Sequence, residues 1–262
     1  MKRVFLLLLL MGFLASCKNE KKSSEEVVSE VNVEQVKFRE VKLDTSLFGD
    51  CRGMGCPQVE VEYFKPEKGN AIAESIDEKN SQELLELLHI NEQKPKAGNI
   101  EEAVKNFGEE YFEYKTNFPN SAGGYELKLK QEVLSENPQT IVLETLFYIY
   151  TAGAHGYSGT RFLNFDSKTG KFLTHNDLIN DIPAFTDFVE KAFRQQYEIP
   201  AADEINAHGF FFDEGEFVLP ENIAVTDESV ILIYNPYEAA SYAQGSLRLF
   251  FPKKTVERWF NY

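Results

Sequence analysis

The sequence predicts an α+β fold of two small domains, in which antiparallel sheets each pack against one or two helices. Segments of alternating apolar and polar residues follow one another in pairs that are typical of hairpins. Each half of the chain also holds long stretches with apolar residues at helical spacing. With 262 residues, of which 43% are hydrophobic, the chain is long enough to bury a substantial core.

The first half shows both patterns clearly. Val59, Val61 and Tyr63 alternate with glutamates, as in a strand with one buried and one solvent-exposed face. A helical apolar pattern over residues 70–90 is interrupted near Asn80, and Asn99 is expected to cap the next helix. The run 141–150 is mostly apolar on both faces, which predicts a central strand covered on each side. The expected strands are 36–43, 59–63, 125–133 and 141–150.

The second half repeats this organisation. The turn DSKTG at residues 166–170 predicts a hairpin, and either Thr174 or Asn176 is expected to cap a short helix. Residues 185–197 form a strongly amphipathic helical pattern. The expected strands are 161–166, 171–173, 217–219, 223–226, 230–234 and 247–251, and the other expected helices are 177–179 and 254–260.

The first 17 residues, MKRVFLLLLLMGFLASC, indicate an export signal. Two basic residues precede an apolar run of 11 residues, shorter than the roughly 20 that a membrane-spanning helix needs. The run ends in LASC, which resembles the lipobox of bacterial lipoproteins; a plain secretory signal is the alternative. We therefore expect a signal peptide over residues 1–16 and lipidation of Cys17, which would attach the protein to the membrane.

A charged segment follows the expected cleavage site. Residues 17–35 lack aromatic side chains and are rich in Lys, Glu and Ser, so we expect a solvated tether. Lys18 stands where lipoproteins kept at the inner membrane of Gram-negative cells typically have Asp. In such a host we expect a lipid-anchored protein of the cell envelope, in the outer membrane with a periplasmic or surface face.

The charge balance excludes one class of function. The chain has 27 basic and 42 acidic residues, a net charge of −15 that becomes −17 when residues 1–16 are removed. A protein with so strong an acidic excess is not expected to bind nucleic acid. A cationic partner would instead be attracted, although acidity also serves solubility alone.

Two cysteines remain once Cys17 carries lipid. Cys51 and Cys56 lie in the segment CRGMGC, whose glycines allow the chain to fold back on itself. In an exported protein an even pair at this distance predicts a disulfide. A metal site would need further ligands close by, and the spacing differs from the Cys-x-x-Cys of thiol oxidoreductases.

Two sequence blocks carry a family resemblance. YTAGAHGYSGTRFLNFDSKTGKFLTHNDLI at residues 150–179 and LPENIAVTDESVILIYNPYEAASYAQGSLRLFFP at residues 219–252 resemble a C-terminal domain of unknown function. That RsiV-like domain forms most of the extracellular part of the lysozyme-sensing anti-sigma-V factor. The segment before it resembles a domain found ahead of a peptidoglycan deacetylase. The resemblance implies domains at residues 36–154 and 155–262.

The resemblance implies a secreted sensing or binding module at the cell envelope. The sigma-binding segment and the deacetylase's catalytic domain have no counterpart in this sequence, so neither activity carries over. Ala152 and Ser241 stand where the family often has glycine and proline. In the anti-sigma relative the ligand is lysozyme, a basic protein.

Sequence motifs for catalysis are missing. The four histidines show no HExxH or other i, i+4 spacing, and there is no GxSxG motif or phosphate-binding glycine loop. We therefore expect no metal, no cofactor and no enzymatic activity. The carboxylates of Asp213, Glu214 and Glu216 could serve a glycosidase, but a solvated loop explains them better.

A tyrosine-rich segment is the best candidate for binding. Pro236 stiffens a loop that carries Tyr237 and is followed by Tyr242, while His155 and Tyr157 are expected on the same side. A role as a plug between the domains is the alternative for these tyrosines. We expect a lipid-anchored binding or sensing protein that captures a lysozyme-like cationic glycosidase; the alternative is a protein that binds or modifies peptidoglycan.

Overall fold

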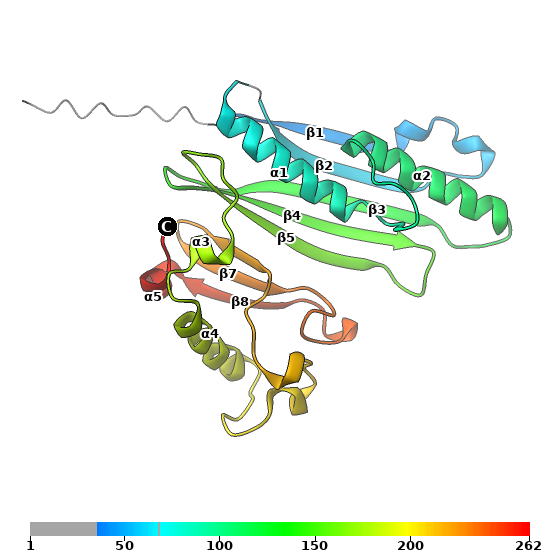
Figure 1. Cartoon of the computed structure of the whole chain (residues 1–262). Helices are drawn as coiled ribbons and strands as arrows, with labels where there is room; N and C mark the ends of the chain where they lie inside the picture. Colours follow the sequence, from blue (N-terminus) through cyan, green and yellow to red (C-terminus); the bar gives the residue numbers. More distant parts are fainter. Residues whose placement is uncertain (1–35, 68) are drawn as a thin grey trace, which may run out of the picture. The chain divides into compact units, whose positions relative to one another are not determined.

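Two β-sheets with helices packed on them make up the structure, a computed structural model that describes residues 36–67 and 69–262 (Figure 1). One sheet has five strands of mixed direction and the other has three antiparallel strands. The predicted α+β class is thereby confirmed. The expected signal peptide, the lipidation site Cys17 and the tether lie outside the described residues.

The five-stranded sheet follows the order of the chain, β1-β2-β3-β4-β5. Only β2 and β3 run parallel, because the chain crosses between them through two helices. The elements are β1 (Phe38–Asp44), β2 (Gln58–Pro66), α1 (Ala71–Leu87), α2 (Ile100–Asn117), β3 (Tyr125–Glu136), β4 (Thr140–Thr151) and β5 (Tyr157–Asp166). Both helices cover the same face of this sheet (Figure 1).

Asparagine side chains begin both of these helices. Asn70 accepts a hydrogen bond from Ala73 N, and Asn99 accepts one from Glu102 N, as predicted for Asn99. The interruption at Asn80 does not end α1. The buried side chain of Asn80 donates a hydrogen bond to Phe64 O and exchanges hydrogen bonds with the buried Gln131 on β3. Because its polar atoms all have partners, Asn80 can be buried within the helix.

The three-stranded sheet has the order β6-β7-β8. Its main cover is α4, whose Phe185, Val189 and Phe193 are fully buried in the largest core cluster. Thr174 rather than Asn176 begins α3. The helices and strands are α3 (His175–Leu178), α4 (Ile182–Gln196), β6 (Asn222–Val225), β7 (Ser229–Tyr234), β8 (Leu247–Pro252) and α5 (Lys253–Val256). The 3-10 turns are η1 (Thr45–Phe48), η2 (Cys51–Gly53), η3 (Ile205–His208), η4 (Asp213–Gly215), η5 (Tyr242–Gln244) and η6 (Glu257–Trp259).

Three local predictions need correction. Residues 217–219 form no strand, because Phe217 enters the core from a loop and packs on Phe193. Residues 171–173 pair with β5 only at one bridge, Phe165 with Phe172. The strand β4 is not covered along its whole length, since Leu146 is 44% exposed while Val142 packs against the second sheet.

The strand β5 lies beyond the expected domain boundary at residues 154/155, yet it pairs with β4 along its length. The described residues, 36–67 and 69–262, belong to one compact unit. The division into domains at residues 36–154 and 155–262 stays a prediction.

Three asparagines join the outer edge of β5 to the second sheet; we call them the asparagine bridge. Asn164 on β5 donates to Ile223 O at 2.7 Å and accepts from Val225 N at 3.0 Å. In the other direction, the side chain of Asn235 bonds both to the N–H and to the carbonyl of Thr160, at 2.9 Å each. Asn222 accepts from the N–H of Phe162 at 3.3 Å. Side-chain amides thus satisfy backbone groups that a neighbouring strand would otherwise pair.

Cys51 and Cys56 form the predicted disulfide, with 5.1 Å between their Cα atoms. Cys51 is fully buried and packs with Tyr111 and Phe112 of α2. The bond therefore closes the segment between β1 and β2 and holds it against α2.

We expect the double variant Cys51→Ala/Cys56→Ala to lose about 2 kcal/mol of unfolding free energy, the value for closing so short a loop. Urea unfolding of the oxidised proteins measures the difference. Reductant should lower the stability of the wild type and leave the variant unchanged; equal stability of the two proteins would contradict a structural role for the bond.

Candidate functional site

The structure brings together the five residues that the sequence singles out for partner binding; we call them the aromatic cluster. His155 lies in the turn before β5, and Tyr157 is the first residue of β5. Pro236 and Tyr237 belong to the loop after β7, and Tyr242 begins η5. The cluster therefore combines the β4–β5 turn with the β7–β8 connection. Its role in binding stays a prediction.

Stacked rings form the centre of the cluster. The ring of His155 lies 4.0 Å from that of Tyr242, and Tyr237 stacks on Tyr242 at 5.7 Å. The hydroxyl of Tyr242 donates to Gly156 O at 2.7 Å. His155 Nδ1 is 3.0 Å from the same carbonyl, so a proton on Nδ1 leaves Nε2 free to accept from the Tyr237 hydroxyl at 3.4 Å. The stack is thereby fixed to the backbone of the turn.

Tyr157 connects the stack to the first sheet. Its ring packs 5.9 Å from Phe147 of β4, and its hydroxyl donates to Pro236 O at 3.5 Å. Burial raises the pKa of the Tyr157 phenol, with a further contribution from the carboxylate of Glu238. Tyr157 therefore stays a neutral donor and supports the loop that carries Tyr237.

Tyr237 occupies an unfavourable backbone conformation. The hydrogen bond from Glu238 N to Asn235 O closes a turn with Pro236 and Tyr237 at its centre. Tyr237 has φ +72°, which with proline before it makes a type II turn, where glycine or asparagine is preferred. A bulky residue in this conformation costs about 1–2 kcal/mol. The turn directs a 54% exposed tyrosine ring outward at that cost.

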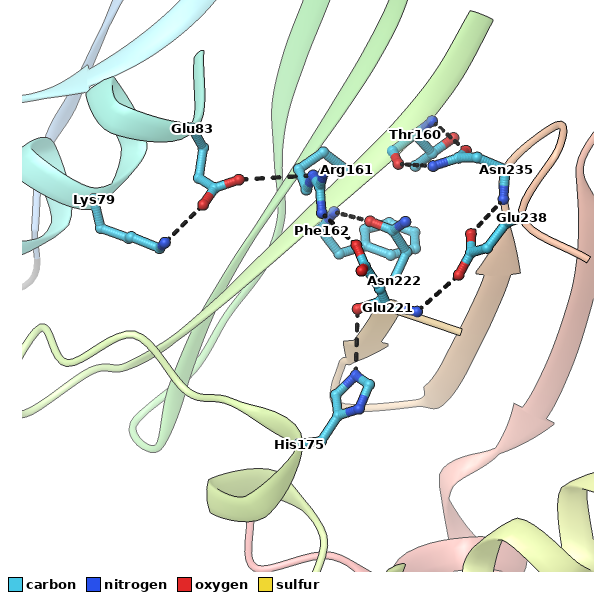
Figure 2. Close-up of polar contacts among 10 residues, drawn as sticks. All are labelled: Lys79, Glu83, Thr160, Arg161, Phe162, His175, Glu221, Asn222, Asn235 and Glu238. Carbon is cyan, nitrogen blue, oxygen red and sulfur yellow. Dashed lines mark hydrogen bonds and ion pairs between the residues drawn. The ribbon is translucent and has the colours of Figure 1, made fainter. Parts of the chain in front are cut away.

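Polar contacts hold this turn in place (Figure 2). The carboxylate of Glu238 accepts from Asn235 N at 2.8 Å and from Glu221 N at 3.0 Å. Desolvation raises the pKa of Glu238, and these two N–H donors act in the opposite direction. Together with the bonds of Asn235 to Thr160, they connect the Tyr237 turn to both sheets. These contacts hold the loop to both sheets at several points.

A row of charged groups extends from this turn to α1 (Figure 2). Arg161 on β5 lies 3.6 Å from the carboxylate of Glu221 and 3.7 Å from that of Glu83 on α1. Lys79 donates to Glu83 at 2.6 Å, and His175 Nε2 is 3.3 Å from Glu221 O. These contacts link α1, β5 and the segment before β6. Their role is to position these elements.

Sequence reasoning did not find the residues that support the cluster. The sequence analysis assigned no role to four of these residues, Thr160, Arg161, Asn164 and Asn222. Asparagine is depleted in strands, so its presence at position 164 of a predicted strand could have indicated a side-chain hydrogen bond to another segment. Its partners lie about 60 residues away in the chain, and no local pattern identifies them.

The described residues contain no cluster of side chains that could bind a metal ion. No three His, Cys, Asp or Glu side chains come close enough there to hold a metal ion. His208, the last residue of η3, lies with its Nε2 2.9 Å from a carboxylate oxygen of Asp203. Among the described helices, none combines the length and the apolar character needed to cross a membrane.

The matched family covers the second sheet and its helices. Residues 172–254 match the model of a family described as a protein of unknown function, DUF3298. This segment is similar to the DUF3298 family. It contains Pro236, Tyr237 and Tyr242, while His155 and Tyr157 precede it. The aromatic cluster therefore joins the matched segment to β5 and to the turn before β5.

Two solved structures show the same fold. A DUF3298 family member from Bacteroides fragilis is 21% identical, with a TM-score of 0.67 over 87% of this chain and 94% of that one. A DUF3298 family protein from Pseudomonas aeruginosa is 19% identical, with a TM-score of 0.62 over 87% and 95%. These alignments extend well beyond residues 172–254, so the shared fold includes strands before the matched segment. No curated protein matches the chain.

Proposed function

We propose that this protein is a lipid-anchored, non-catalytic binding protein of the bacterial envelope, whose aromatic cluster binds a lysozyme-like cationic glycosidase. The observation that carries the proposal is the exposed, preorganised ring of Tyr237, held in a strained turn and backed by Tyr242 and His155. Tyrosines in rigid loops are frequent anchors of protein interfaces, because a large apolar ring and a hydroxyl bind at low entropic cost.

Charge supports a cationic partner. The net charge of −15 attracts a basic protein from solution and raises its association rate. Glu238, next to Tyr157, places a carboxylate beside the cluster. Selectivity would then come from the rings, because long-range attraction alone does not discriminate among basic proteins.

The sequence resemblance to the extracellular domains of a lysozyme-sensing anti-sigma factor agrees with this partner class. The expected lipid on Cys17 would keep the binding protein at the membrane surface, where a wall-degrading enzyme acts. A chain with this anchor could bind the glycosidase as an inhibitor or as a sensor.

The proposal is tested with soluble protein comprising residues 18–262 and a panel of lysozymes of different structural classes. We expect a complex at low ionic strength that weakens as salt is added, together with loss of muramidase activity if the protein is an inhibitor. Absence of a complex with every lysozyme at low salt would exclude this partner class.

Binding of peptidoglycan is the second candidate, favoured by the flat stack of Tyr237, Tyr242 and His155. Aromatic faces of this kind also suit sugar rings. Retention of residues 18–262 on purified peptidoglycan, lost on Tyr237→Asn and without any lysozyme present, would favour this function instead.

The membrane attachment has its own test. In cells treated with globomycin, which blocks lipoprotein signal peptidase, we expect the uncut precursor to accumulate, and Cys17→Ser should prevent lipid labelling. Release of a freely diffusing product from treated cells would show an ordinary secretory signal.

A further inference from the structure

A concave surface lies apart from the aromatic cluster, where the end of β3 meets the β6–β7 turn and β8. This groove has a volume of about 380 Å³ and shares no lining residue with the cluster. That volume is within the range of roughly 300–1,000 Å³ in which proteins hold small ligands or single side chains of a partner. It is large enough to take one apolar side chain together with its neighbours.

Part of the lining of the groove is apolar. It consists of Leu134, Ile231 and Phe250, and Phe250 is 61% exposed although it belongs to a strand. The register of β3 against β4 shifts between Val133 and Ser135, at Leu134. Such a bulge redirects a side chain, and here Leu134 packs with the cluster that contains Ile231. The sheet is thus shaped to leave an open apolar surface beside Phe250.

Three acidic residues also line the groove. They are Glu136 at the end of β3 and Asp227 and Glu228 of the β6–β7 turn. Within residues 36–67 and 69–262, no ion pair joins any of these three carboxylates to a basic group. Burial raises the pKa of Glu136, so this carboxylate would gain from a basic partner. The Asp227 carboxylate accepts a hydrogen bond from the side chain of Asn137. Apolar side chains beside carboxylates that make no ion pair complement a segment in which basic side chains flank an apolar one.

We propose that this groove binds a short basic segment of a partner protein, in which one apolar side chain lies between lysines or arginines. The apolar side chain packs on Phe250 and Leu134, and the flanking cations face Glu136 and Glu228. This second site is independent of the proposed function of the aromatic cluster. It would allow the protein to hold two partners, or two parts of one partner, at the same time.

The test uses soluble residues 18–262 and a fluorescein-labelled peptide with one phenylalanine between two pairs of lysines. Fluorescence anisotropy at low salt should show saturable binding. We expect Phe250→Ser and the double variant Glu136→Gln/Glu228→Gln each to weaken binding about tenfold. Added salt should weaken the wild type strongly and the double variant less.

Matched controls separate the groove from general effects. Phe118→Ser changes a phenylalanine of similar exposure, 59%, at the end of α2. Glu92→Gln/Glu198→Gln removes two exposed carboxylates elsewhere. Both controls should bind like the wild type, and a peptide with glutamates in place of lysines should not bind. No saturable binding, or equal losses in groove and control variants, would overturn the proposal. Because Tyr237→Asn should leave this peptide's affinity unchanged, failure of the cluster's function and failure of the groove are distinguishable.

Discussion

Replacing Asn164 by alanine is expected to lower the free energy of unfolding by about 3 kcal/mol. The side chain is 3% exposed and makes two hydrogen bonds, to Ile223 O and from Val225 N. Ile223 and Val225 are themselves buried, so water cannot replace the lost partner. A buried backbone group that loses its hydrogen-bond partner costs about 1–3 kcal/mol, so the loss of one side-chain amide has a large effect on stability.

Chemical denaturation of the wild type, Asn164→Ala and the control Asn261→Ala measures the difference. Asn261 also donates one hydrogen bond, to Asp177 O, but it is exposed and water can take its place. We expect the control to lose less than about 1 kcal/mol. Similar losses in the two variants would mean that the asparagine bridge contributes little to the attachment of the second sheet.

Gly170→Ala is expected to destabilise the fold by a similar amount, about 3 kcal/mol, for a different reason. Gly170 has φ +72°, and a Cβ added there would lie 2.5 Å from the backbone oxygen of Ile72 on α1. The left-handed conformation costs an alanine about 1–2 kcal/mol, and the clash with backbone adds about 1–3 kcal/mol. The turn after β5 would therefore have to move away from α1, and the bond from Ser75 Oγ to Gly170 O would be strained.

Gly209→Ala is the matched control. Gly209 also has a positive φ, +87°, but the nearest atom to an added Cβ is 3.8 Å away. Thermal unfolding should show a small loss for Gly209→Ala, from backbone strain alone, and a clearly larger loss for Gly170→Ala. Equal shifts in the two melting temperatures would contradict the close approach of the turn to α1.

The sequence was sufficient for features that depend on local pattern. The Asn99 cap, the Cys51–Cys56 disulfide and the amphipathic α4 follow from side chains a few residues apart, and the structure confirms them. The apolar content of residues 217–219 led to a wrong prediction of a strand. A loop residue such as Phe217 can pack in a core without pairing with a strand.

Long-range polar contacts were beyond sequence reasoning. The tyrosines near residue 237 were recognised from their loop, but their support depends on Thr160 and Glu221, which approach only after both sheets have formed. The register shift at Leu134, a residue that lines the groove, likewise depends on the pairing of β3 with β4. Such contacts have no periodic signature in the chain.

The central claim is that Tyr237 binds a partner and is not needed for the fold. The most direct test compares the affinity of wild type, Tyr237→Asn and Phe118→Ala for a lysozyme that the wild type binds. Asparagine tolerates a positive φ, so Tyr237→Asn should unfold within about 1 kcal/mol of the wild type. We expect at least a tenfold loss of affinity for Tyr237→Asn and none for Phe118→Ala. Equal affinity of Tyr237→Asn and the wild type would contradict the account.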